Sequence, residues 1–105
     1  MQTSWSQYWR EAQYFEGHPF LTGETAVYLR DAGAALVGID SLNIDDTSGG
    51  ERPVHSTLLA ADIPIVEHLT GLAQLPETDF RFFAVTVKVK AFGTFPVRAF
   101  ALLEA

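Results

Sequence analysis

The chain of 105 residues carries 13 acidic and seven basic side chains, which gives a net charge of −6. An acidic chain without a basic patch repels phosphate groups, so the composition argues against nucleic acid and against an anionic membrane surface as partners. The lack of cysteine excludes disulfides, thiolate zinc sites and cysteine nucleophiles.

Length and the amino-terminal sequence set further bounds. A chain this short forms at most one domain, so we expect a single domain over residues 1–105. The first eight residues have neither the basic nor the apolar region of a signal peptide, and no apolar run approaches the ~20 residues of a membrane span. We therefore expect a cytoplasmic protein. Its 48% hydrophobic content predicts either a tightly filled core or an apolar surface that needs a partner.

The aromatic residues of the amino-terminal segment follow a helical spacing. Trp5, Tyr8 and Trp9, together with Ala12, fall at positions i, i+3, i+4 and i+7. This spacing predicts a short helix over residues 4–15, with its large rings packed against a sizeable partner surface.

A second helix is predicted to begin after Thr22 and to end at Gly33. The Thr22 hydroxyl can cap its first turn, and Glu24 in that turn is favoured by the helix dipole. Glycine is common where a helix ends. The expected apolar face of this helix comprises Ala26, Val27, Leu29 and Ala32.

Two buried strands and a third helix are predicted in the middle of the chain. Residues 34–40 are apolar on both faces, as in a sheet that is covered on both sides, and residues 63–68 are predicted to form another short strand. Between them lie a polar loop, residues 41–53, and a short helix, residues 54–61.

The carboxyl-terminal part of the chain is predicted to form a β-hairpin. Residues 80–90 are predicted to form one strand, since valines at 85, 87 and 89 alternate with threonine and lysine at 86, 88 and 90. Residues 95–103 are predicted to form the returning strand. The chain as a whole is therefore expected to be mixed α/β, with about five short strands and three short helices.

His55 and Glu67 are the candidate metal ligands. Imidazole and carboxylate suit zinc or manganese, which need three or four protein ligands. The twelve-residue gap is not a local metal motif, so from spacing alone the pair is more readily explained as a histidine at a helix start and a solvent-facing carboxylate. Because strand side chains alternate, Glu67 and His68 are expected to face opposite sides.

Other polar residues are expected to have structural roles. Asp40, Ser41 and Asp45 follow a predicted strand, where short polar side chains turn the chain by bonding to their own backbone. A contact with a ligand is the alternative for these three residues. His18 is more readily explained as a loop histidine than as a ligand.

Three runs in this order resemble the carboxyl-terminal half of the cyclase family of metal-dependent hydrolases, which includes kynurenine formamidase and isatin hydrolase: residues 37–41, 53–55 and 63–67. The resemblance implies a mixed-sheet, swivelling β/β/α-like half domain with a C-terminal β-hairpin. It also implies that His55 and Glu67 are metal ligands. In one departure, Phe20 stands where the family usually has a glycine after the proline.

The resemblance further implies a hydrolase that acts on a small amide or lactam, such as N-formylkynurenine in tryptophan catabolism. The family's remaining ligands lie in a His-x-Gly-Thr-His-x-Asp-x-Pro-x-His motif of the amino-terminal half, which this sequence does not contain. We therefore expect a truncated or split form that holds zinc or manganese weakly or not at all by itself. The alternative is a non-catalytic oligomerising remnant or a subunit of a split hydrolase.

A partner is expected on the same grounds. Removing half of one core would expose the apolar faces that packed against it, so we expect a homo-oligomer or an association with a separate amino-terminal half. Trp5, Tyr8, Trp9 and the strand near Ile39 are expected close to that interface. Catalytic and substrate-binding residues are not assigned by the sequence.

Overall fold

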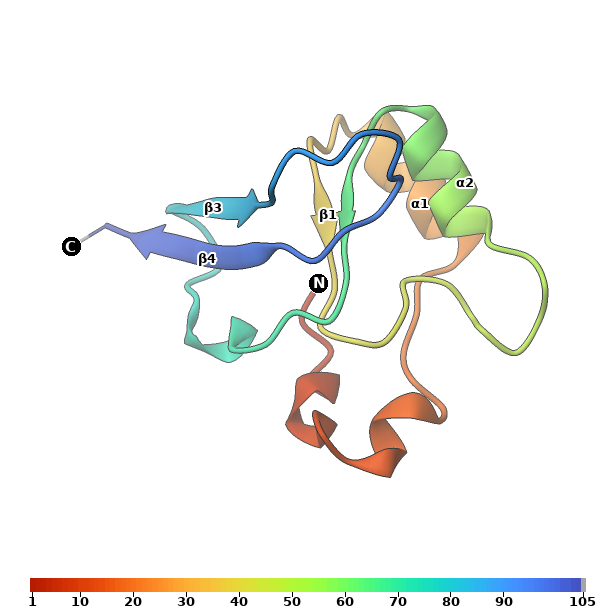
Figure 1. The fold of residues 1–105 in the computed structure, drawn as a ribbon, viewed down its shortest axis with the longest axis horizontal. Coiled ribbons are helices and arrows are strands. Elements are labelled where there is room, and N and C mark those ends of the chain that lie inside the picture. Colours follow the sequence, from red (N-terminus) through yellow and green to blue (C-terminus); the bar gives the residue numbers. More distant parts are fainter. Residues whose placement is uncertain (105) are drawn as a thin grey trace. The chain divides into compact units, whose positions relative to one another are not determined.

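The computed structural model describes residues 1–104 and shows a mixed α/β chain with one small parallel and one small antiparallel sheet (Figure 1). Two compact units can be distinguished, unit 1 (Met1–Leu72) and unit 2 (Ala73–Ala105). The helices and strands are, in chain order, α1 (Gly23–Asp31), β1 (Val37–Gly38), α2 (Pro53–Ala60), β2 (Ile65–Val66), β3 (Phe80–Val85) and β4 (Arg98–Leu103). Three 3₁₀ turns accompany them: η1 (Trp5–Tyr8), η2 (Ala12–Phe15) and η3 (Leu72–Gln74).

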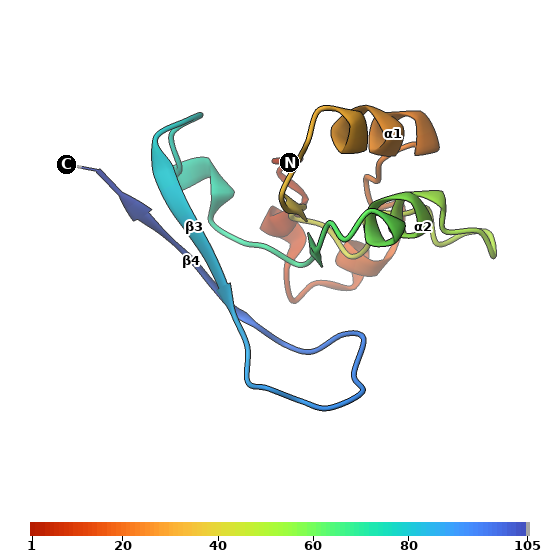
Figure 2. The same cartoon turned by 90° about the horizontal axis from the view of Figure 1, so that it is seen from above.

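Unit 1 is built on the parallel pair β1–β2, in which Val37 lies opposite Ile65. The helices α1 and α2 lie side by side next to this pair (Figures 1 and 2). Backbone bonds continue the pairing past both strands, because Ile39 N donates to Val66 O at 2.9 Å and Leu69 N donates to Ile39 O at 3.2 Å. The carboxyl ends of β1 and β2 therefore meet at the same edge.

The core of unit 1 is formed by aliphatic side chains from both helices, both strands and the loop after β1. Its fully buried members are Ala26, Ile39, Ile44, Val54 and Leu58. Within residues 1–104, every hydrophobic side chain that is buried belongs to unit 1.

Local sequence signals explain where the two α-helices begin. The Thr22 hydroxyl accepts a hydrogen bond from Thr25 N at 3.2 Å, as predicted for a cap of α1. Pro53 begins α2, a position where its missing N–H is not needed. The predicted apolar face of α1 is only partly right, since Ala26 is buried whereas Val27 is exposed.

The predicted helix over residues 4–15 is wrong. Two 3₁₀ turns, η1 and η2, stand in its place, separated by Arg10 at a positive φ of 73°. The aromatic rings pack on one another instead of forming a helical stripe: the Trp9 and Tyr14 ring centroids are 5.2 Å apart, and Trp5 Nε1 donates to Tyr14 O at 3.0 Å. Contacts among large rings thus override the spacing signal here.

The predicted strands are shorter than expected. In the middle of the chain only two residues of each predicted strand pair regularly. In unit 2, β3 ends at Val85 and leaves Val87 exposed. If the register of β3 and β4 continued by two more residues, Pro96 would lie opposite Val87, and proline has no N–H to donate to the ladder.

Up to residue 104, unit 2 is an antiparallel pair of strands without a buried hydrophobic side chain. The Phe83 and Phe100 rings stack at a centroid distance of 4.9 Å, yet Phe100 and Leu102, both on β4, are exposed. None of the helices in residues 1–104 combines the length and the apolar character that a membrane span requires.

Replacing Leu58 by alanine is expected to lower the free energy of unfolding by about 2–5 kcal/mol, because the side chain is fully buried between α2 and the rest of the core. Leu59→Ala is the matched control: this neighbour is 54% exposed, and its loss is expected to cost about 0.5 kcal/mol or less. Urea unfolding followed by circular dichroism measures both. Equal costs for the two variants would contradict the assignment of the core.

Candidate metal site

The candidate site lies where the carboxyl ends of β1 and β2 meet. The segment after β1 contains Asp40 and Asp45, the segment after β2 contains Glu67, and the first turn of α2 contributes His55. In sheets with parallel strands, the carboxyl ends of the strands are the usual place for ligands.

The structure brings His55 and Glu67 together. Nε2 of His55 lies 3.5 Å from Oε2 of Glu67, and the two side chains are 20% and 23% exposed. The distance is longer than the ~2.7–3.2 Å of a good N–H···O hydrogen bond. Nε2 of His55 and Oε2 of Glu67 are thus close neighbours without a good hydrogen bond between them, so each can still bind another atom.

Asp45 fixes the other side of the His55 ring. Its carboxylate oxygen Oδ2 accepts a hydrogen bond from His55 Nδ1 at 2.7 Å and another from His55 N at 2.9 Å, while Oδ1 accepts one from Val54 N at 2.8 Å. Burial alone would raise the pKa of Asp45, but the hydrogen bonds from His55 and Val54 outweigh it and hold that pKa below its ordinary value of 3.8. The carboxylate therefore stays ionised and acts only as an acceptor.

Glu67 is held by the residue next to Asp45. Its Oε2 accepts a hydrogen bond from Ile44 N at 2.8 Å. Asp45 N in turn donates to the Asn43 side chain at 2.9 Å. One short loop thus orients both candidate ligands.

Asp40 and Ser41 bind other segments of the chain and make no hydrogen bond with His55 or Glu67. The Asp40 carboxylate is 1% exposed and accepts hydrogen bonds from Thr3 N, the Thr3 hydroxyl and Ser4 N at 2.6–3.1 Å. The Ser41 hydroxyl donates to Pro19 O at 2.9 Å. The predicted bonding to the local backbone is seen for Ser41, whose hydroxyl also lies 3.1 Å from Asn43 O, whereas Asp40 binds the distant amino-terminal segment.

His68 has a different partner from Glu67, although the two are adjacent in sequence. Its Nδ1 lies 3.0 Å from the hydroxyl of Tyr14, and its backbone has a positive φ of 61°. The sequence analysis did not identify Tyr14 as a buried residue, but the structure leaves only 1% of it exposed. Burial, followed by the negative charges of Asp40 and Glu67, raises the pKa of Tyr14 to about 12.

His18 is buried with both ring nitrogens occupied. Nδ1 lies 3.0 Å from Pro19 O and Nε2 lies 3.2 Å from the Thr47 hydroxyl. A ring that is satisfied on both sides has no free nitrogen to offer to an ion, which agrees with its interpretation as a loop histidine.

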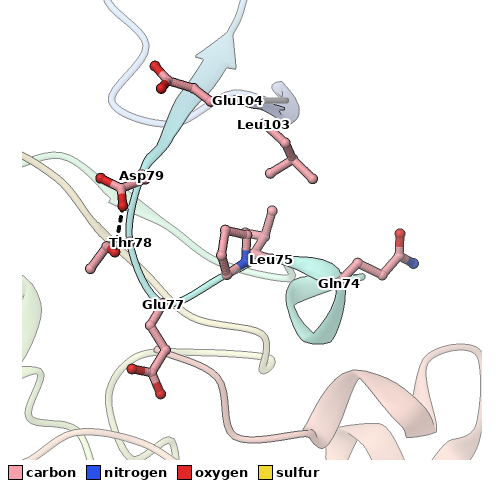
Figure 3. Close-up of a pocket in the computed structure, with 8 residues that line it drawn as sticks. Gln74, Leu75, Glu77, Thr78, Asp79, Leu103 and Glu104 are labelled. Carbon is pink, nitrogen blue, oxygen red and sulfur yellow. Dashed lines mark hydrogen bonds between the residues drawn. The ribbon is translucent and has the colours of Figure 1, made fainter.

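A concave region of unit 2 offers no comparable arrangement. Leu75, Leu103 and three acidic side chains line it, and the Glu77 carboxylate points away from Asp79 (Figure 3). Among residues 1–104, no group of three or more histidine, aspartate and glutamate side chains is arranged to hold a metal ion. Within that part of the chain, His55 and Glu67 are therefore a pair of candidate ligands without a third.

Sequence reasoning missed the bond between Asp45 and His55. A sign of it was present: with Pro53 at the first position of α2, the N–H groups of Val54 and His55 are the first that need an acceptor. Nothing in the sequence says that this acceptor comes from ten residues upstream, because that depends on how the intervening loop closes.

Comparison with known proteins confirms the similarity to the cyclase family. The family model described as "Putative cyclase" matches residues 1–46. A kynurenine formamidase of Paracidovorax citrulli (strain AAC00-1) is 32% identical over 76 residues, which are 72% of this chain and 35% of that protein. A kynurenine formamidase of Salinibacter ruber (strain DSM 13855 / M31) is 33% identical over 76 residues, again 72% of this chain and 35% of that protein. The chain thus spans about a third of the length of these relatives.

The fold is also similar to that of a solved protein described as "The Structure Of Potential Metal-Dependent Hydrolase With Cyclase Activity". The TM-score is 0.67 at 30% sequence identity, and the match covers 86% of this chain and 46% of the other. The family-model match ends before His55 and Glu67, so their pairing rests on the geometry described above.

The Tyr14 hydroxyl is expected to ionise in the folded protein at about pH 12, against an ordinary pKa of 10.0. Because the folded pKa lies above the unfolded one, the stability linked to this group is complete below about pH 10 and is lost as the pH rises towards 12. Phenolate absorbance during an alkaline titration checks this, with Tyr14→Phe removing the late step. A Tyr14 that ionises near pH 10 in the folded state would contradict the burial described.

Proposed function

We propose that this chain contributes His55 and Glu67 as two ligands of a divalent-metal site in a cyclase-family hydrolase. The proposed substrate is a small amide or lactam, with N-formylkynurenine and similar aryl formamides as the leading class. Support for the substrate comes from the kynurenine formamidases, and support for the metal comes from the solved metal-dependent hydrolase.

The distance between the two ligand atoms is the observation that carries the proposal. Two atoms bound to one tetrahedral zinc ion at ~2.0–2.2 Å stand about 3.4 Å apart. Nε2 of His55 and Oε2 of Glu67 are separated by 3.5 Å. The pair therefore needs almost no rearrangement to share an ion, and its nitrogen and oxygen donors suit zinc or manganese.

The chain's own residues position the ion and orient its ligands. Asp45 holds the His55 ring, and Ile44 N donates a hydrogen bond to Oε2 of Glu67, the oxygen that faces the ring. A bound divalent ion would lower the pKa of a coordinated water and so supply a nucleophile at neutral pH. Two ligands bind such an ion weakly, so a full site requires further ligands from another segment or another chain.

A second function, that of a non-catalytic oligomerising subunit, is favoured by unit 2. Residues 80–103 contain four basic residues and no acidic one, whereas all 13 acidic residues lie elsewhere in the chain. This segment is also rich in exposed apolar side chains, among them Val85, Phe100 and Leu102. We propose that it docks on the acidic unit 1 of a second copy of the chain, which would cover apolar surface and pair opposite charges.

Metal binding by the isolated chain tests the first proposal. Calorimetric titration with Zn²⁺ or Mn²⁺ is expected to show weak binding of one ion, which His55→Ala and Glu67→Gln each abolish because a single remaining ligand cannot hold it. His68→Ala is the control, since its ring faces Tyr14 instead. Binding that survives His55→Ala, or that requires His68, would contradict the assignment.

Hydrolysis of an aryl formamide tests the proposed reaction. We expect turnover only when Zn²⁺ or Mn²⁺ and a separately produced segment with the family's amino-terminal histidine motif are both added, because that segment would supply the missing ligands. His55→Ala in this mixture is expected to abolish turnover. Equal rates with and without that substitution would refute a role of His55 in the reaction.

Light scattering at micromolar concentration tests the second proposal. The chain is expected to be a dimer, and Leu102→Asp is expected to make it monomeric by placing a charge on the docking segment. Leu102→Met, which keeps an apolar side chain at the same exposed position, is the control and is expected to leave the dimer intact. A stable monomer before any substitution would contradict the proposal.

A further inference from the structure

We infer that Asp45 is a positioning residue: it fixes the proton of the His55 ring on Nδ1 and so leaves Nε2, the nitrogen next to Glu67, free to bind an ion. The part of this inference that concerns the ion rests on the proposed metal site. The part that concerns the proton rests on the geometry of Asp45 and His55 alone.

Three donors from α2 converge on the Asp45 carboxylate. They are Val54 N at 2.8 Å, His55 N at 2.9 Å and His55 Nδ1 at 2.7 Å. The side chain is 1% exposed, so solvent does not compete for these bonds. The backbone bond fixes where the His55 Cα lies, and the ring bond fixes how the imidazole is turned.

The identity of the acceptor decides which tautomer is present. An ionised carboxylate has no proton to donate, so the short contact with Nδ1 requires that this nitrogen carry the proton. In the neutral ring the lone pair then lies on Nε2. That atom is the one 3.5 Å from Oε2 of Glu67. Carboxylates that hold the second nitrogen of a metal-binding histidine in this way fix its tautomer and make it a stronger ligand.

Capping of α2 does not account for all three bonds. Pro53 has no N–H, so the backbone bonds from Val54 and His55 satisfy the first free donors of the helix. A carboxylate serving only as a cap needs no contact with the ring. The additional bond to Nδ1 is shorter than either backbone bond, which points to a role in orienting the imidazole.

Nitrogen-15 NMR of the metal-free chain measures the tautomer directly. At a pH where the ring shifts show a neutral imidazole, we expect Nδ1 of His55 to be protonated and Nε2 to be unprotonated. The signals are assigned among the three histidines by their loss in His55→Gln. A wild-type ring protonated on Nε2 would overturn the inference, and this outcome does not depend on any variant folding.

Two neighbouring carboxylates provide a matched pair of variants. Asp45→Ala is expected to allow the Nε2-protonated form of His55 and to weaken Zn²⁺ binding about 10- to 100-fold. Asp46→Ala removes the same charge from an exposed side chain that accepts a hydrogen bond from Ser48 N, and it is expected to change neither property. If Asp45→Ala lowers the melting temperature but leaves the tautomer as in the wild type, Asp45 is a helix cap only and the inference fails.

The experiment separates the two claims. A wild-type ring with the proton on Nδ1 that does not respond to Zn²⁺ contradicts the proposed metal site but leaves the assignment of the tautomer standing. If Zn²⁺ shifts the His55 ring signals equally in Asp45→Ala and in the wild type, the proposed metal site stands but Asp45 has no role in positioning its histidine.

Discussion

The candidate site depends on the hydrogen bonds that the buried Asp45 carboxylate accepts from the start of α2. A charge removed from water costs free energy unless several donors compensate it, and here three donors from α2 do so. The same bonds tie the loop after β1 to the start of α2. Since Ile44, the preceding residue, holds Glu67, two consecutive residues of one loop place both candidate ligands.

The register of the short parallel pair completes this arrangement. Gly38 lies opposite Val66, so the segments that follow each strand leave the sheet side by side. His55 arrives from α2, which is held by the burial of Val54 and Leu58. Residues that are 10 to 23 positions apart thereby come within hydrogen-bond range without any local motif.

Local signals in the sequence predicted the parts of the fold that depend on near neighbours. Thr22 caps α1 three residues before its partner, and Pro53 opens α2, so both helices are found close to where they were expected. The amino-terminal segment was mispredicted because its rings pack on one another rather than along a helix. The partnership of Asp45 with His55 could not be predicted, because it depends on the closure of a long polar loop. The approach of His55 to Glu67 was suggested only by the family resemblance.

The position of His55 within α2 has a consequence for temperature. An eight-residue helix has little stability of its own and is kept in place by packing. His55 is in its first turn, so fraying of that turn would move the imidazole away from the Glu67 carboxylate, which follows β2. An ion held at the proposed site would therefore be lost on warming before the core of unit 1 unfolds. A substitution that weakens the packing of the buried Leu58 side chain of α2 would lower the temperature of that loss further.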